Sequence, residues 1–190
     1  MIPKHRARVN HRDALLDALK SLISEGSVHD VTLEGVAARA GVTKGGLIYH
    51  FKSKEALLHG LVERMRHRVD AYCIDTTLEP RAALKNFLIS RIDYAFSIDQ
   101  KEKQVMANLL AAAASYPSLL TPVRAMYDNN GAGSLAGIAN SAGLTLSVWT
   151  ALDGFLLLEM LNIRRFSELE RQQMKDNLVA LVERQFAAPD

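Results

Sequence analysis

The stretch of sequence that decides the fold is residues 32–54, TLEGVAARAGVTKGGLIYHFKSK. Apolar residues recur at helical spacing over residues 33–40, and Gly41 follows them. A second, shorter helical segment begins at Thr43 and ends in the aromatic and basic cluster YHFK, residues 49–52. Two short helices joined by a Gly-containing turn of three or four residues form a helix-turn-helix unit, whose second helix enters the DNA major groove. The stretch therefore predicts DNA binding.

Together with its flanks, residues 8–58, this stretch resembles the DNA-binding signature of the tetracycline-repressor (TetR) family of bacterial regulators. The resemblance implies an all-α protein of about nine helices. It places a helix-turn-helix DNA-binding domain of three helices in residues 1–52 and a ligand-binding and dimerisation domain in residues 53–190. It also implies a homodimer on palindromic double-stranded operator DNA, from which a small apolar or amphipathic molecule releases the protein.

Length and composition fit a globular DNA-binding protein of the cytoplasm. The chain has 190 residues, 48% hydrophobic and 23% charged, so that it can bury a sizeable core. No apolar run follows the basic start MIPKHRAR, so no secretory signal is expected, and the single cysteine, Cys73, cannot form an internal disulfide. Residues 1–66 carry 11 Lys and Arg against 7 Asp and Glu, although the whole chain has a net charge of only +2. A basic N-terminal part beside a mildly acidic remainder supports nucleic-acid binding.

Helices are predicted throughout the chain, because no stretch alternates apolar and polar residues for long enough to indicate a strand. Thr32, Thr43 and Ser53 each precede a predicted helix, and each hydroxyl can accept a hydrogen bond from its first turn. Asp99 and Ser167 are each followed three residues later by Glu, which is the spacing of a capping box. The predicted helices cover residues 9–24, 33–40, 43–52, 54–74, 80–96, 99–116, 121–131, 144–163 and 167–186.

The predicted helix at residues 144–163 is apolar on nearly every side. A membrane span is the rival interpretation, but Asp153 and Glu159 within about 20 residues argue against it, so no membrane partner is expected. A helix that is apolar all round must be covered all round. The helices at residues 144–163 and 167–186 are therefore predicted to form a four-helix dimer interface with a second copy of the chain.

The candidate DNA-binding residues flank and form the second helix of the motif. Thr43 caps this helix, Lys44 projects from its start, and two glycines would let the backbone approach DNA closely. Gly46 departs from the family, which more often has a hydroxyl or alanine there. Leu47 also belongs to the expected small core, with Leu33, Val36, Ala37, Ile48 and Phe51, while Tyr49 could pack and His50 could be a solvated residue. The candidates are Thr32, Thr43, Lys44, Gly45, Gly46, Leu47, Tyr49, His50 and Lys54.

Three further groups of residues have both a functional and a plain structural interpretation. The basic leader with Lys4, His5, Arg6, Arg8 and Arg12 is either a solvated tail or an arm on DNA. His59, Glu63 and His67 share a helix face that could hold a metal, but a solvated face is favoured and no metal site is predicted. Cys73 is expected to be a small buried residue rather than a redox sensor.

The effector site is predicted from the apolar, aromatic and flexible side chains of the C-terminal part, which suit an apolar pocket. Each of them alone could equally be ordinary core. Asp153, in an apolar helix, could bond a ligand, but a partner within the fold or across the dimer is favoured. The candidate ligand-binding residues are Met65, Tyr72, Phe96, Met106, Met126, Tyr127, Trp149 and Phe155.

Catalytic signatures such as HExxH, GxSxG or a phosphate loop do not occur in the sequence. The chain is therefore expected to be neither an enzyme nor dependent on a cofactor. The favoured function is a ligand-responsive transcriptional regulator, most simply a repressor. The alternative is a ligand-independent DNA-binding or architectural protein, which would not need a C-terminal domain larger than its DNA-binding unit.

Overall fold

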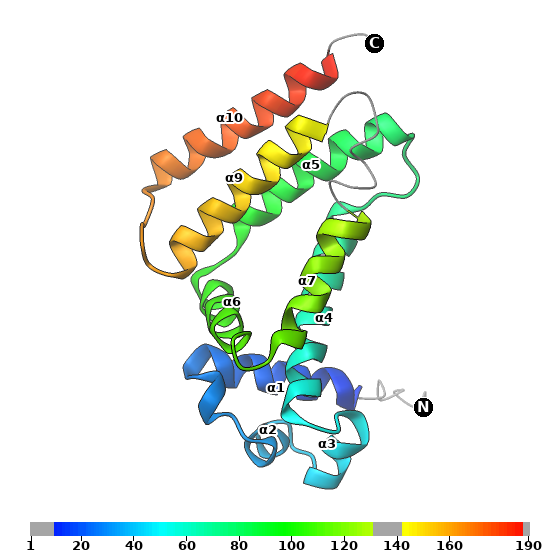
Figure 1. Ribbon diagram of the computed structural model, residues 1–190, viewed down its shortest axis with the longest axis vertical. Helices are drawn as coiled ribbons and strands as arrows, with labels where there is room; N and C mark the ends of the chain where they lie inside the picture. Colours follow the sequence, from blue (N-terminus) through cyan, green and yellow to red (C-terminus); the bar gives the residue numbers. More distant parts are fainter. Residues whose placement is uncertain (1–9, 131–141, 188–190) are drawn as a thin grey trace, which may run out of the picture.

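The computed structural model describes residues 10–130 and 142–187, and this part of the chain forms nine α-helices and no strand, which confirms the predicted all-α fold. In Figure 1, α1, α2 and α3 form the lower end, α5, α9 and α10 the upper end, and α4, α6 and α7 lie between them. The helices are α1 (His11–Glu25), α2 (Leu33–Arg39), α3 (Lys44–His50), α4 (Lys54–Cys73), α5 (Pro80–Ser97), α6 (Gln100–Ala112), α7 (Thr121–Ala125), α9 (Ala142–Met160) and α10 (Glu168–Ala187).

The middle of the chain departs from the predicted helix boundaries. α6 ends at Ala112, four residues short of the expected end, and the 3-10 turn η2 (Pro117–Leu120) follows. Proline cannot continue a helix and disfavours helical backbone in the residue before it, which accounts for the break. α7 has only five residues and continues as the π-helical segment η3 (Met126–Asn130). Residues 1–9, with most of the basic leader, and residues 131–141 lie outside the described part.

Short polar side chains begin the helices as the sequence predicts. The hydroxyls of Thr32, Thr43 and Ser53 accept hydrogen bonds from backbone N–H groups in the first turns of α2, α3 and α4. Ser167 forms a complete capping box with Glu170, since each side chain bonds the other's backbone N–H, at 3.2 and 2.8 Å. Such caps stabilise a helix by about 1 kcal/mol each.

Two glycines are required by the local geometry of the N-terminal unit. Gly41, in the turn between α2 and α3, has φ +68°, a left-handed conformation that residues with a Cβ rarely adopt. Gly60, within α4, faces the Phe51 ring so closely that a Cβ would lie 2.7 Å from Phe51 Cε1. Phe51 can therefore be buried under α4 only because residue 60 has no side chain.

The first hydrophobic core joins α1, α2, α3, the first half of α4 and the end of α6. Leu15, Leu47 and Leu58 are among its fully buried side chains. Leu57 and Leu61 of α4 belong to the same core, so packing continues across the predicted domain boundary at residue 52. The prediction that Ile48 lies in this core is wrong, because its side chain is exposed on the outer side of α3.

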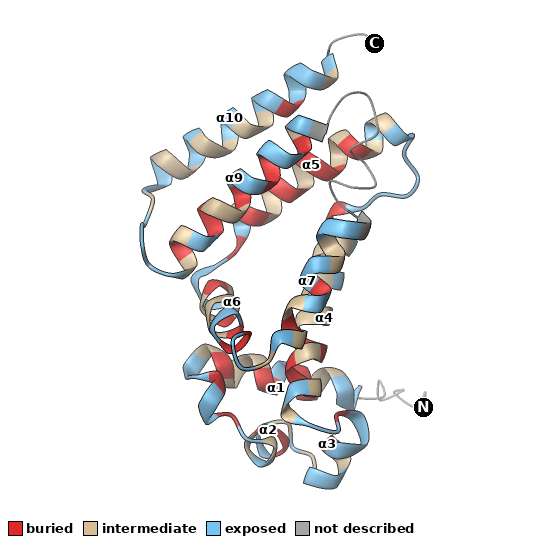
Figure 2. Cartoon of the chain, viewed as in Figure 1, coloured by how far each residue is buried: buried red, intermediate tan, exposed pale blue. Residues whose placement is uncertain are grey.

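The second hydrophobic core lies at the opposite end, among α5, α9 and α10. α10 packs along α5, and α9 packs against both α5 and α6. Figure 2 shows buried residues along α5 and α9, whereas most of α10 is exposed or intermediate. Leu88, Ile92 and Leu152 are completely buried in this core.

A buried ionic cluster joins α6, α9 and α10. The Glu159 carboxylate accepts hydrogen bonds from Lys103 Nζ at 2.5 Å and from Arg171 Nη1 at 2.7 Å. Arg171 also donates to the Phe96 backbone carbonyl at 2.8 Å. Burial alone would raise the pKa of Glu159, but the hydrogen bonds from Lys103 and Arg171 outweigh it and hold the pKa below its usual value. Glu159 therefore stays ionised and fixes α9 to its neighbours.

Candidate DNA-binding surface and effector cavity

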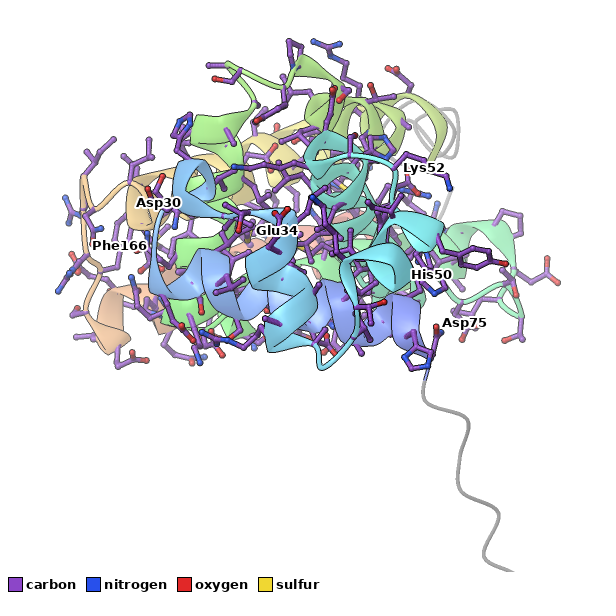
Figure 3. The ribbon with its side chains drawn as sticks, turned by 90° about the horizontal axis from the view of Figure 1, so that it is seen from below. Asp30, Glu34, His50, Lys52, Asp75 and Phe166 are labelled. Atoms are coloured by element: carbon purple, nitrogen blue, oxygen red, sulfur yellow. The ribbon has the colours of Figure 1, made fainter. Side chains whose placement is uncertain are left out.

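The outer surface of α3 carries exposed aromatic and basic side chains. Tyr49 is 78% exposed, and its ring meets that of His50 edge-on, with the centroids 5.1 Å apart. Figure 3, which views the molecule from below, shows His50 and Lys52 on this side of the protein, beside α3. Lys52 belongs to the YHFK cluster, residues 49–52, and is not among the residues that the motif predicts to contact DNA. Its exposed cationic side chain at the end of α3 adds it to the surface.

The two candidate threonines have structural roles at this surface. Thr32 accepts from Gly35 N–H at 3.1 Å, and Thr43 accepts from Gly46 N–H at 3.0 Å. Both threonines are exposed, so their hydroxyl protons remain available to a partner. Gly45 is exposed as well, which leaves the backbone at the start of α3 open to close approach.

Lys44 is already paired in the free protein. Its Nζ lies 2.5 Å from the Glu34 carboxylate on α2, and both side chains are more than half exposed. The hydrogen bond from Lys44 lowers the pKa of Glu34. A DNA phosphate would therefore have to compete with Glu34 for this lysine. Glu34 and Lys44 are ten residues apart in the sequence, and this spacing alone does not predict that their side chains meet.

Two of the candidates lie differently from what the motif suggested. Leu47 is 0% exposed in the first hydrophobic core, so it cannot contact DNA, and its selection is corrected. Lys54 Nζ donates to the His29 backbone carbonyl at 3.1 Å, and partial burial lowers its pKa. Lys54 thus ties α4 to η1 (Val28–Asp30), and it must leave that carbonyl to reach a phosphate.

A cavity of about 270 Å³ lies between α4, α5, α6, α7 and α9. Its wall is mostly apolar. Four of the predicted ligand-binding residues line it, namely Met65, Met106, Met126 and Tyr127. This volume lies near the low end of the range for small-molecule sites, so the cavity suits a ligand of modest size.

The other four predicted ligand-binding residues, Tyr72, Phe96, Trp149 and Phe155, do not line this cavity. Tyr72 is 56% exposed, and its ring lies 5.5 Å from that of Tyr94, which does line the cavity. Phe96 and Phe155 stack on each other with centroids 4.4 Å apart, next to the buried ionic cluster. Trp149 is buried behind the wall, where it packs on Phe87 and on the Tyr127 ring. Helical spacing gives the face of a helix but not which of its neighbours that face meets.

A few polar side chains also line the mostly apolar cavity wall. The Tyr127 hydroxyl donates to the Asp153 carboxylate, and burial, followed by this bond, raises the pKa of Tyr127. Glu102 lines the wall and also accepts from Lys20 of α1. Arg66 and Arg91 reach the wall from α4 and α5, and neither was selected from the sequence. The internal partner expected for Asp153 is therefore Tyr127.

The free surface of α9 and α10 is apolar for a helix pair on the outside of a protein. Leu146 and Leu157 of α9, Leu161 directly after α9, and Leu181 of α10 are exposed. Residues Gly143–Met160 of α9 are long and apolar enough to cross a membrane, a test that core helices of soluble proteins also pass. This helix instead carries Glu159, paired with two cations inside the protein.

Neither the histidine face nor the cysteine indicates metal or redox chemistry. On α4, His67 Nε2 lies 3.4 Å from Glu63, and no group of three metal-ligating side chains occurs within residues 10–130 and 142–187. Cys73 is buried, as predicted, and burial raises the pKa of its thiol to about 11. The thiol is therefore protonated and unreactive at neutral pH.

A three-helix unit with an exposed second helix of a helix-turn-helix, joined to a larger helical domain, is the architecture of helix-turn-helix transcriptional regulators. Residues 15–61 match the family described as bacterial regulatory proteins, tetR family, and residues 85–183 match the tetracyclin repressor-like C-terminal domain. The chain belongs to the TetR family of transcriptional regulators, as the sequence motif predicts. Members of this family bind DNA and are not enzymes.

The individual proteins that this chain resembles share less than a third of its residues. The HTH-type transcriptional regulator RutR of Escherichia coli (strain K12) is 29% identical over 146 residues, which cover 74% of this chain and 68% of RutR. A putative transcriptional regulator from Pseudomonas aeruginosa PAO1 has a similar fold, with TM-score 0.70, 20% identity, and coverage of 93% of this chain and 90% of that chain. The multidrug binding protein EbrR, solved with ethidium, has TM-score 0.63 and 20% identity over 90% of this chain and 98% of that chain.

Proposed function

We propose that this regulator is a ligand-responsive repressor, which a small apolar or amphipathic molecule releases from a palindromic operator. The observation that carries the proposal is that one wall of the cavity is bonded directly to the DNA-binding unit. Glu102 lines the cavity from α6 and forms an ion pair with Lys20 of α1. The structural neighbour EbrR, which was solved with ethidium, supports the idea that such a core can hold a small molecule.

Two helices can carry a change from the cavity to DNA. α4 supplies Met65 and Val69 to the cavity wall, and its first half packs in the core of the N-terminal unit. α6 is fastened to the end of α1 by Asn108, whose amide donates to the backbone carbonyls of Ile23 at 2.8 Å and Gly26 at 2.9 Å. A ligand that pushes α4 and α6 apart would therefore tilt α1, and with it α3.

On DNA, the exposed side chains of α3 would make the contacts. We assign contacts with base edges or phosphates to Lys44, and contacts with the DNA backbone to Tyr49, His50 and Lys52. Gly45 and Gly46 permit close approach, and Thr32, Thr43 and Lys54 supply peripheral phosphate contacts. Phosphate contacts fix the position of a protein on the duplex, whereas contacts to base edges determine which DNA sequence it recognises.

Dimerisation through α9 and α10 would place two α3 helices on one face of the DNA. The apolar surface that a second copy would cover is formed by exposed leucines on and directly after these helices, namely Leu146, Leu157, Leu161 and Leu181. A stable interface of this kind buries above about 1,000 Å² in total. The proposed division is a DNA-binding domain in residues 1–52 and a ligand-binding and dimerisation domain in residues 53–190, in a cytoplasmic protein.

Reciprocal linkage tests the proposal. Operator affinity is measured by fluorescence anisotropy over a panel of apolar and amphipathic compounds, and each compound's affinity is then measured with and without operator. An inducer should weaken operator binding about 5- to 150-fold, and operator must weaken the compound by the same factor. Compounds that fill the cavity but bind equally in both states would contradict ligand-responsive release and favour ligand-independent DNA binding.

A further inference from the structure

Arg91 is a buried cation on the cavity wall for which residues 10–130 and 142–187 supply no paired anion. Its side chain projects from α5 and the residue is only 7% exposed. Within the described part of the chain it forms no ion pair, its Nε has no hydrogen-bond partner, and the side chain with which it does form a hydrogen bond, the Cys73 thiol, carries no charge. Moving a charged group out of water without a partner is unfavourable, so buried charges are ordinarily paired. Arg91 is an exception that calls for a partner from outside the chain.

The immediate neighbours of Arg91 are neutral. Its guanidinium lies 5.6 Å from the centre of the Trp149 ring, a cation–π contact. It also lies near the Cys73 thiol, whose pKa burial raises to about 11 in spite of the arginine. Burial likewise raises the pKa values of Tyr94 and Tyr127, so both phenols are protonated at neutral pH. None of these four side chains can neutralise the guanidinium.

The other charged side chains on the cavity wall each have an ionic or hydrogen-bonded partner, although Arg66 Nε and Glu102 Oε1 themselves have no hydrogen-bond partner. Arg66 bonds Asp70 at 2.7 Å and lies 3.9 Å from Glu63. Glu102 is paired with Lys20. Asp153 accepts from the Tyr127 hydroxyl and is only partly buried. Within the described part of the chain, Arg91 therefore differs from Arg66, Glu102 and Asp153 in being deeply buried with no charged partner, since the side chain that it hydrogen-bonds, the Cys73 thiol, is neutral.

We infer that the effector is an amphipathic monoanion, with a carboxylate that pairs with Arg91 and an apolar body that fills the remaining cavity. This inference rests on the proposed function, because it specifies the chemistry of the molecule that the cavity receives. A carboxylate accepts two parallel hydrogen bonds from a guanidinium, which makes arginine the best-suited cation for it. The apolar body would contact Met65, Met106 and Leu156, which line the same space.

The test compares probes that differ only in the head group. Octanoate and decanoate are titrated against 1-octanol, 1-decanol, octylamine and decylamine, all below their aggregation thresholds. Trp149 is the only tryptophan in the chain and contacts Arg91, so its fluorescence reports binding, and thermal shifts provide a second readout. Each carboxylate is expected to bind about 10- to 100-fold more tightly than its matched alcohol, the factor of a charge-assisted hydrogen bond.

Two Arg91 variants and one control assign the effect to the guanidinium. Arg91→Met and Arg91→Gln should reduce carboxylate binding to the level of the alcohols, while alcohol binding is unchanged or tighter. Both variants should melt no lower than the parent without ligand, because an unpaired buried charge has been removed. Arg124→Met, which removes an exposed arginine of α7 outside the cavity wall, should leave the preference for carboxylates intact.

The outcomes separate the inference from the proposed function. Carboxylates that bind no better than their alcohols, including the case in which none binds, overturn the inference, as does a carboxylate preference that persists in both Arg91 variants. Alcohols or amines that bind best and release operator would refute the anionic ligand but leave the repressor mechanism standing. Carboxylates that bind through Arg91 without changing operator affinity would support the anion site and refute ligand-responsive release.

Discussion

Removal of Glu159 should be among the most destabilising single changes in the protein. The side chains of Lys103 and Glu159 are only 5% and 8% exposed, and Arg171 shares the same carboxylate. Glu159→Leu would leave the Lys103 ammonium buried with no anion. Breaking a buried pair from one side costs about 3–5 kcal/mol, a large fraction of the roughly 5–15 kcal/mol that stabilises a domain.

The double variant Lys103→Met/Glu159→Leu should recover most of that loss. It replaces the pair with apolar side chains of similar size, an exchange that is often close to neutral. Arg171 keeps its hydrogen bond to the Phe96 carbonyl and has access to water. The coupling energy between the two positions should therefore be at least about 2 kcal/mol in the double-mutant cycle.

The assay is urea denaturation followed by Trp149 fluorescence at one fixed protein concentration, since dimer stability depends on concentration. The ion pair of Lys85 and Glu183 between α5 and α10, 2.6 Å long and 36% and 49% exposed, is the matched control. Its double-mutant cycle should give less than about 1 kcal/mol. Equal couplings in the two cycles, or a double variant as unstable as the sum of the single ones, would refute the reasoning.

Three further outcomes are expected. The folded-state pKa of Glu159 is depressed, so its ion pairs contribute fully to stability above its ordinary pKa of 4.5, and this contribution is lost as the pH falls further. The urea midpoint of a Glu159→Gln variant should therefore fall less on acidification than that of the parent. Lys44→Ala should weaken operator binding and lower the salt slope by about one unit, whereas Glu34→Gln should strengthen binding by freeing Lys44, and no change in either variant would remove Lys44 from the contacts. Leu157→Glu should shift light scattering from dimer to monomer, with Gln173→Glu as a charged control at an exposed position of α10, and a stable dimer in the first variant would place the interface elsewhere.

The N-terminal unit could be predicted closely because its signals are local. The caps at Thr32, Thr43 and Ser53 act within one turn of the same helix, so the sequence nearly suffices to place them. Two features of the same unit depend on contacts between helices. The burial of Leu47 and the bond from Lys54 to the His29 carbonyl arise where α1, α3 and α4 meet, and neither follows from spacing.

The cavity was harder to predict because its wall comes from five helices. Met65, Met106 and Met126 line it, whereas Phe96, Phe155 and Trp149 face the second hydrophobic core. The position of an aromatic residue in a helix sequence does not indicate which neighbouring helix its side chain packs against. Arg91 was missed for a different reason, since an arginine among apolar residues of a helix is ordinarily solvated, and only its burial makes it unusual.

The link between α1 and α6 should determine how strongly the effector acts on DNA. Lys20 pairs with Glu102 on the cavity wall but does not itself line the cavity. Lys20→Met should therefore leave effector affinity in the absence of DNA nearly unchanged. It should reduce the ratio of operator affinities without and with effector by about 2- to 5-fold, since a partly exposed pair contributes up to about 1 kcal/mol.

A second variant separates this link from general destabilisation. Asn108→Ala in the Lys20→Met background removes the remaining hydrogen bonds from α6 to the end of α1, so the ratio should fall again. Lys101→Met, which removes an exposed cation of α6, should leave the ratio unchanged. If both α1–α6 variants keep the parental ratio while binding effector normally, the signal does not depend on these polar bonds and passes through α4 or through the apolar packing of α6 on α1, which these substitutions do not alter.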